Sequence, residues 1–244
     1  MSHRTALSTA RVAVRRALDR ASSPIGSVLR FAGCGNRIAL TFDDGPDPEV
    51  TPRLVESLDR ASISATFFML FSRVERYPDI AELVRASGHE VALHGLDHRR
   101  LTDLTPTEAY SSLAVGKHAL EQALGVSVFW YRPPYGAHNH RIWRQVRSMK
   151  MQMVLWGPTL RDSRILTPEE RWQGAKARPG DIVLAHDGVA GSMDGADDPP
   201  PAEVDRVACS MAVAERYKSQ GLAFATLSEL ASVGRATRGA RWTK

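Results

Sequence analysis

Cysteine is nearly absent from this chain of 244 residues, which contains only Cys34 and Cys209. Two cysteines without a characteristic spacing exclude a disulfide-framework protein, and we expect both thiols to be buried or inert. Long hydrophobic runs are also missing: no stretch of about 18 apolar residues occurs, so no membrane-spanning helix is predicted. Arginines interrupt every apolar run near the N-terminus, which excludes the apolar region of roughly 7–15 residues of a signal peptide. These absences predict a cytoplasmic protein.

The net charge of +5 is concentrated at the two ends of the chain. Residues 1–37 contain seven arginines and one acid, and residues 231–244 contain four basic residues and no acid. The intervening residues contain 21 basic and 26 acidic side chains, so this region is mildly acidic. Because a nucleic-acid-binding fold needs a basic stripe, we predict no nucleic-acid partner.

A helix is predicted over residues 4–22, where Leu7, Val14 and Leu18 recur at helical spacing among arginines. This basic helix either packs on the rest of the protein or contacts an anionic membrane surface, at the inner face of the membrane. We therefore divide the chain into an N-terminal helix and linker (1–35), one domain (36–231) and a basic tail (232–244).

Short apolar runs alternate with helical patterns through the central domain. An apolar fraction of 43% is that of a soluble globular protein, and the alternation predicts a parallel sheet covered by helices, either a barrel or a doubly wound sheet. The predicted strands cover 38–42, 65–71, 90–93, 126–131, 152–156, 181–185 and 222–227. The predicted helices cover 51–61, 80–87, 105–124, 140–149, 167–177 and 202–220, and a long loop covers 189–201.

Polar side chains follow the ends of several predicted strands. Parallel strands share one carboxyl edge, so these side chains should converge on one rim, where α/β enzymes place their sites. The residues concerned are Asp43, Asp44, His94, His98, Arg132, Tyr135 and His186.

His94 and His98 have the i, i+4 spacing that allows two imidazoles to face one metal ion. A carboxylate from Asp43 or Asp44 would complete three protein ligands, the number typical of catalytic zinc, with water in the fourth position. The same ligand types also suit a non-haem iron oxygenase. The competing interpretation is that Asp-Asp-Gly-Pro forms an ordinary surface turn.

His186 follows a different strand and is a candidate proton donor, provided that a nearby carboxylate raises its pKa. Asp162 and Asp187 both qualify as that carboxylate. The alternative is a core histidine whose hydrogen bonds are satisfied within the protein.

Five segments in order resemble the NodB-homology polysaccharide deacetylases, carbohydrate esterase family 4. The resemblance covers about residues 36–231. Its motifs are Thr41-Phe42-Asp43-Asp44-Gly45-Pro46, His94-Gly-Leu-Asp-His98, Arg132-Pro133-Pro134-Tyr135-Gly136, Asp162 and Leu184-Ala185-His186.

The resemblance implies a single-domain α/β fold, a distorted (β/α) barrel of seven or eight strands, here with an extra N-terminal helix. It implies a divalent metal, most often Zn²⁺ but also Co²⁺, Ni²⁺ or Mn²⁺, and loss of the N-acetyl group from an amino-sugar saccharide as acetate. The implied metal ligands are Asp44, His94 and His98.

The resemblance also implies the catalytic residues. Asp43 is the expected general base and Arg132 its partner. His186 is the expected acid, and Asp162 tunes it. The Tyr135 backbone N–H is expected to stabilise the oxyanion.

Two positions differ from the family pattern. Gly95 replaces the usual Ser or Thr after the first histidine, and Ser163 replaces the usual Trp after Asp162. We expect Leu184 and Pro134 to contact the substrate, and Trp156 or loop 189–201 to fill the wall that the missing Trp leaves open.

The identity of the saccharide stays open at this stage. A chitin-like or peptidoglycan substrate lies outside the cytoplasm, where the sequence signals do not place this protein. The alternative substrate is a polyprenyl-phosphate-linked N-acetylhexosamine at the cytoplasmic membrane face, where the basic ends would contact anionic lipid.

Overall fold

The computed structural model describes residues 25–199 and 201–240, and its centre is a curved parallel sheet of seven strands. Six strands follow the order β6-β5-β4-β3-β2-β7, and β8 pairs with β2. The strands are β1 Ser27–Ala32, β2 Arg37–Asp43, β3 Thr66–Leu70, β4 Glu90–Gly95, β5 Trp130–Tyr131, β6 Gln152–Met153, β7 Ile182–His186, β8 Ala223–Phe224 and β9 Arg235–Gly239. The expected α/β fold with a parallel sheet is therefore confirmed.

The helices of the described residues follow the strands along the chain, as a parallel sheet requires. They are α2 Thr51–Arg60, α3 Phe71–Arg76, α4 Pro78–Ala86, α5 Pro106–Leu124, α6 His140–Ser148, α7 Pro168–Ala175, α8 Arg206–Ser219 and α9 Leu227–Val233. A capping box of Thr105 and Glu108 opens α5, and another at Thr226 starts α9. Because α9 begins there, the last parallel strand is shorter than the expected 222–227.

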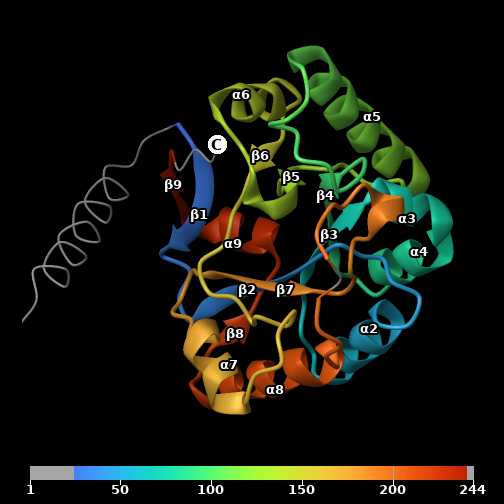
Figure 1. The fold of residues 1–244 in the computed structure, drawn as a ribbon. Coiled ribbons are helices and arrows are strands. Elements are labelled where there is room, and N and C mark those ends of the chain that lie inside the picture. Colours follow the sequence, from blue (N-terminus) through green and yellow to red (C-terminus); the bar gives the residue numbers. More distant parts are fainter. Residues whose placement is uncertain (1–24, 200, 241–244) are drawn as a thin grey trace, which may run out of the picture.

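Alternation along the strands separates two apolar clusters. Outward side chains such as Leu40 and Phe42 pack beneath the surrounding helices. Inward side chains such as Trp130 and Ile182 form a second cluster with Phe31, Leu227 and Leu230. Figure 1 shows α9 at the centre of the curved sheet and α5 and α8 around its outside.

In the described residues, the strands at the two edges of the sheet, β6 and β7, do not pair with each other, so paired strands do not close the sheet into a barrel. The chain after β6 bridges this opening, because the Gly157 N–H donates to the Ile182 carbonyl at 3.0 Å and the Leu160 N–H to the Leu184 carbonyl at 2.9 Å. Residues 157–160 therefore lie beside β7 and continue the curved wall.

Strands β1 and β9 form a separate antiparallel pair that the sequence analysis did not predict. They fall in the expected linker (1–35) and tail (232–244), two segments that the sequence analysis placed outside the central domain. Phe31 of β1 packs edge-on against Trp130, with ring centroids 6.1 Å apart, which ties the pair to the inner cluster. The residues of β9, Arg-Ala-Thr-Arg-Gly, have no apolar alternation, so only their pairing with β1 reveals the strand.

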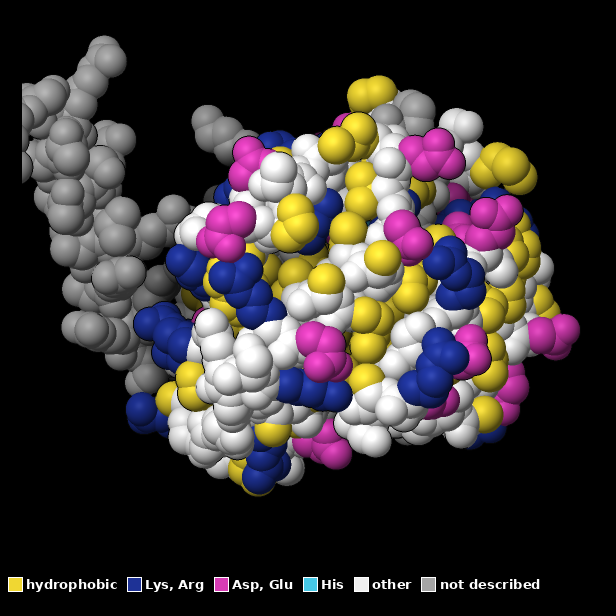
Figure 2. Space-filling view, turned by 90° about the horizontal axis from the view of Figure 1, so that it is seen from below, with side chains coloured by type: hydrophobic (Ala, Val, Ile, Leu, Met, Phe, Trp, Pro, Cys, Tyr) yellow, Lys and Arg dark blue, Asp and Glu magenta, His cyan; other side chains and the backbone are white. Residues whose placement is uncertain are grey.

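The predicted helix over 4–22, and with it the proposed membrane contact, lies outside the described residues. Among the helices of residues 25–199 and 201–240, none combines the length and the apolar character needed to cross a bilayer. Figure 2 shows basic and acidic side chains interspersed on the face that carries α7 and α8, rather than a continuous basic surface.

Candidate metal and active site

The predicted rim residues lie at the carboxyl ends of their strands and face the inside of the curved sheet. Asp43 ends β2, His186 ends β7, and the two are paired in the register of these neighbouring strands. His94 lies near the end of β4, and Arg132 follows β5 directly. Because Phe42, Leu93, Tyr131 and Ala185 turn outward into the core, period-two alternation sends their four polar neighbours inward.

Asp44, His94 and His98 form a cluster suited to a metal ion, with one ligand atom from each within 4.8 Å of the others. Asp44 Oδ1 lies 3.2 Å from Nε2 of His94 and 3.3 Å from Nε2 of His98. Burial raises the pKa of Asp44, but hydrogen bonding to the two imidazoles outweighs it and holds the pKa well below its usual range. The Asp44 carboxylate is therefore anionic at neutral pH, as a metal ligand needs to be.

The hydrogen bonds around the cluster fit a divalent cation. His94 Nδ1 lies 2.9 Å from the Arg132 carbonyl oxygen, so this nitrogen can donate its hydrogen there, and with a cation bound Nε2 would give its lone pair to that cation in place of a hydrogen bond to Asp44. His94 and His98 are both nearly buried. Two imidazole nitrogens and one carboxylate are the donor set of catalytic zinc sites, and the residues present therefore fit the metal.

Asp43 is held by a fully buried arginine. Arg132 Nη1 donates to Asp43 Oδ1 at 2.7 Å and to Thr41 Oγ1 at 2.8 Å. Its guanidinium lies above the Phe68 ring, 4.1 Å from the centroid. Only 3% of Asp43 is exposed, so this ion pair is shielded from water and keeps the carboxylate in one orientation.

His186 pairs with Asp162, which settles the choice between Asp162 and Asp187. The Asp162 carboxylate accepts hydrogen bonds from His186 Nδ1 at 2.8 Å and from the His186 backbone N–H at 2.7 Å. Burial lowers the pKa of His186, but the charge and hydrogen bonds of Asp162 outweigh it and raise the pKa to about 10. His186 is therefore protonated at neutral pH.

Asp187 faces away from this pair and receives a hydrogen bond from Thr51 Oγ1 at 2.7 Å. Burial raises the pKa of Asp187 to about 7. Its carboxylate also explains Gly45: a Cβ at position 45 would lie 2.0 Å from Asp187 Oδ2, so a larger residue displaces the turn that carries Asp44.

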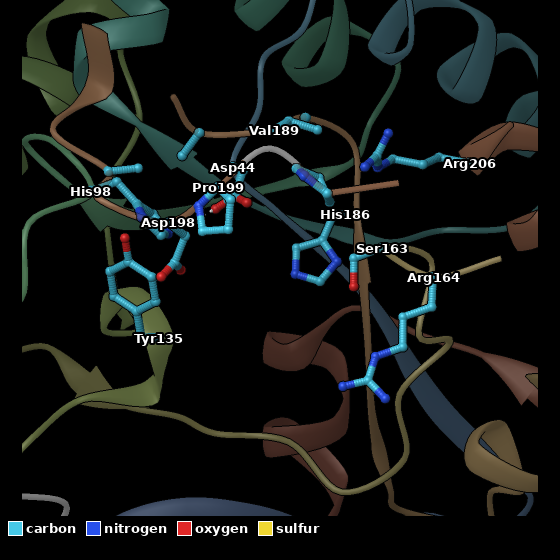
Figure 3. Close-up of a pocket in the computed structure, with 14 residues that line it drawn as sticks. Asp44, His98, Tyr135, Ser163, Arg164, His186, Val189, Asp198, Pro199 and Arg206 are labelled. Carbon is cyan, nitrogen blue, oxygen red and sulfur yellow. Dashed lines mark ion pairs between the residues drawn. The ribbon is translucent and has the colours of Figure 1, made fainter. Parts of the chain in front are cut away.

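A cavity of about 500 Å³ opens beside the cluster (Figure 3). Tyr135 lies on one side of it, where its ring meets His98 at a centroid distance of 4.4 Å. Both Asp44 and Tyr135 adopt left-handed backbone angles, with φ of 75° and 58°, a costly conformation that persists at functional sites when the surrounding structure enforces it.

The three predicted substrate contacts are not among the residues that line this cavity. Leu184 is inward-facing and 6% exposed, two residues before His186 on β7. Pro134 is buried in a short 3₁₀ turn, and Trp156 packs near Gly136 and Arg132. Contact of these side chains with a substrate stays a prediction.

Loop 189–199 lines the cavity and is anchored by Asp194, a residue that the sequence analysis missed. Asp194 is 2% exposed, pairs with Arg73 and Arg76, and its backbone oxygen accepts the His98 N–H at 2.7 Å. Arg73 Nη1 in turn donates to the Asp44 backbone oxygen at 3.0 Å. One buried ion pair thus contacts the backbone of two predicted metal ligands.

Arg164 and Arg206 also line the cavity and were not predicted. Arg164 follows the Asp162-Ser163 pair, and Arg206 is the first residue of α8. No spacing rule connects these positions with the rim, because they reach it from a loop and a helix.

The departure at Gly95 has a steric reason. A Cβ at this position would lie 2.4 Å from the Asp97 backbone oxygen, so the turn between His94 and His98 has no room for a side chain. Glycine therefore permits the tight turn that brings the second histidine to the cluster.

Comparison with known proteins identifies the family of this chain. The family model "Polysaccharide deacetylase" matches residues 32–154. A peptidoglycan-N-acetylglucosamine deacetylase of Bacillus cereus is 32% identical over 197 residues, covering 79% of this chain and 87% of the relative. The solved structure of the peptidoglycan deacetylase PdaC from Bacillus subtilis has a TM-score of 0.66 at 30% identity, covering 81% of this chain and 91% of that structure.

This chain spans less than half the length of a longer relative. The peptidoglycan-N-acetylglucosamine deacetylase PgdA of Listeria monocytogenes is 32% identical over 207 residues, which span 82% of this chain and 40% of the Listeria protein. The sequence motifs, the family model and these relatives all lead to one assignment. The chain belongs to the polysaccharide deacetylase family.

Proposed function

We propose that this protein is a metal-dependent deacetylase that hydrolyses the N-acetyl amide of an amino-sugar saccharide and releases acetate. The observation that carries the proposal is the convergence of three units on one rim: the Asp44–His94–His98 cluster, the Asp43–Arg132 ion pair and the His186–Asp162 pair. Amide hydrolysis needs a base, an electrophilic centre and an acid for the leaving amine, and these units supply one of each.

Asp44, His94 and His98 would hold the metal, which would supply Lewis acidity for the acetyl carbonyl and the attacking water. Asp43 accepts a proton from the attacking water, and the ion pair with Arg132 holds its carboxylate in one orientation. The Tyr135 backbone N–H is the proposed donor to the oxyanion.

His186 donates a proton to the departing amine, which is a poor leaving group without protonation. The Asp162 carboxylate makes this possible at neutral pH, because it raises the pKa of His186 to about 10 and orients the ring through Nδ1. As the product leaves, His186 regains a proton from solvent and Asp43 releases its proton to solvent.

Relatives named for N-acetylglucosamine deacetylation of peptidoglycan and for chitooligosaccharide deacetylation support an N-acetylglucosamine-type substrate. Zn²⁺ is the proposed metal because of the donor set.

The test is acetate release from N-acetylglucosamine oligomers and from peptidoglycan. We expect release that a chelator abolishes and Zn²⁺ restores, and a His94→Ala variant that loses both metal binding and activity. A metal-loaded wild-type protein that releases acetate from neither substrate class, nor from a phosphate-linked N-acetylhexosamine, would overturn the proposal.

A further inference from the structure

The wall of the cavity beside His186 carries a buried arginine without a partner. Arg206 is 9% exposed, and among the described residues it makes no ion pair or hydrogen bond, with its Nε fully shielded from solvent. Figure 3 shows its side chain extending from α8 toward the cavity that Asp44 and His186 also line. Only its Nε is shielded, so the Nη atoms remain accessible in the cavity, where an anion would offset the cost of a largely buried charge that has no partner among the described residues.

The acids near Arg206 have other partners. Asp162 is close enough for the Arg206 charge to lower its pKa, but both of its oxygens accept hydrogen bonds from His186. Asp205 caps the start of α8 through the Ala208 N–H and pairs with Arg53. Asp198 lies across the cavity, on the side of Tyr135 (Figure 3).

A second arginine lies on the same side of the cavity. Arg164 is exposed, lines the cavity and has no acidic partner among the described residues, and Figure 3 shows it on the His186 side with Ser163 and Arg206. Ser163, where the family usually has Trp, is small and leaves space between these arginines and His186. Its hydroxyl is a further hydrogen-bond donor.

We propose that this wall binds an anionic oxygen group, a carboxylate or a phosphate, carried by the acetylated saccharide beside the residue that loses its acetyl group. Arg206 is the principal contact and Arg164 a second contact at the cavity mouth. The inference rests on the proposed deacetylase activity and narrows its substrate class to anionic amino-sugar saccharides. Arginine is suited to this role because its planar fork binds carboxylate and phosphate oxygens in pairs.

The experiment compares kcat/KM for three substrates of similar size: a neutral N-acetylglucosamine oligomer, an oligosaccharide containing N-acetylmuramic acid, and an N-acetylglucosamine oligosaccharide 1-phosphate. We expect at least one anionic substrate to exceed the neutral one about tenfold or more. Arg206→Met should remove this preference, lowering kcat/KM on the anionic substrate by roughly 10–100-fold, the range for a hydrogen bond to a charged group. The neutral substrate should change less than threefold, and Arg164→Met should give a smaller loss of the same kind.

The matched control is Arg216→Met, because Arg216 lies on the same helix and pairs with exposed Glu169. It should leave all three values unchanged. Should Arg206→Met fold poorly, Arg206→Gln and the wild-type substrate preference provide the same test.

Two outcomes would contradict the inference while leaving the proposed activity in place. One is an equal kcat/KM of the wild type for neutral and anionic substrates, and the other is an equal loss of kcat/KM on both substrates in Arg206→Met. Absence of acetate release from every substrate by the metal-loaded wild type refutes the proposed function instead. The anionic substrate with the higher kcat/KM, the N-acetylmuramic acid oligosaccharide or the 1-phosphate, shows whether the bound group is a carboxylate or a phosphate.

Discussion

Two groups of residues at the site are built differently. The strand-end group, Asp43, Asp44, His94, Arg132 and His186, belongs to neighbouring strands of one sheet or follows them directly, and Asp44 and His186 of this group line the cavity. The loop group, Ser163, Arg164, loop 189–199 and Arg206, reaches the cavity from loops and a helix start. The hydrogen-bonded sheet keeps the first group in place, whereas the second depends on contacts between segments far apart in the sequence.

We expect the two groups to have different roles: the strand-end group in the chemical step and the loop group in substrate recognition. The strand-end group contains the proposed base, acid and metal ligands, and the loop group contains the two arginines that have no acidic partner among the described residues. α/β enzymes commonly combine a shared strand-end chemistry with variable loops. We therefore expect strand-end variants to lower kcat for every substrate and loop variants to act selectively.

The largest effect is expected from Asp43→Asn. Removing the proposed base should lower kcat by on the order of 10²–10⁴-fold, while Asp44, His94 and His98 continue to bind metal. Acetate release and calorimetric metal titration measure the two quantities. Thr41→Ser is the control because it keeps the hydroxyl that contacts Arg132, and should leave kcat within a few-fold. Full activity in Asp43→Asn would show that another group is the base.

Asp162→Asn should act next most strongly, and through pH. The Asp162 charge and hydrogen bonds raise the pKa of His186, so their loss lowers that pKa and deprotonates His186 at a lower pH. The alkaline limb of the kcat/KM profile should therefore move to lower pH, with about tenfold less protonated His186 for each pH unit above the new pKa. An unmoved alkaline limb in a folded, metal-loaded variant would contradict the role of His186 as acid.

A smaller effect is expected from Asp194→Asn. Asp194 belongs to the loop group and also contacts the backbone of His98, a predicted metal ligand. Its loss of charge weakens the pairs with Arg73 and Arg76 and loosens the segment whose backbone contacts His98. We expect metal affinity to fall roughly tenfold, as for other residues that orient metal ligands. Asp103→Asn, at an exposed residue whose side chain has Thr102 as its only hydrogen-bond partner in the described region, should leave metal affinity unchanged. Unchanged metal affinity in Asp194→Asn would show that the loop does not position His98.

The smallest effect on activity is expected from Thr105→Ala. This change removes the capping box of α5, away from the cavity, and should lower the free energy of unfolding by about 1 kcal/mol. Chemical denaturation measures that loss, and kcat/KM at a temperature where the protein stays folded should equal the wild-type value. A fall in kcat/KM would mean that the rim depends on the outer helices more than the sheet geometry indicates.

The strand-end group could be predicted from the sequence because its signals are local. Apolar runs ending in Asp43-Asp44, His94 and His186 mark strands of one parallel sheet, and parallel strands place their carboxyl ends together. The loop group had no such signal: Arg206 is the first residue of a helix, and Asp194 is one acid in a polar loop. The burial of Asp194 appears only when the loop lies against α3.

The ends of the domain were also beyond sequence patterns. β1 and β9 are 203 residues apart between Ala32 and Arg235, and neither strand alternates clearly enough to be predicted alone. The choice between Asp162 and Asp187 was open for the same reason, because both are close to a strand end and only one lies within 2.8 Å of His186 Nδ1.

The sequence by itself determined the alternation of strands and helices, the inward set of carboxylates and imidazoles, and the family, because periodicity and motif spacing are properties of neighbouring residues. The tertiary structure decided which acid pairs with His186, that β1 pairs with β9, and that Arg206 is buried beside the site with no partner among the described residues. Those properties depend on which distant segments pack together, and burial and charge pairing exist only after that packing.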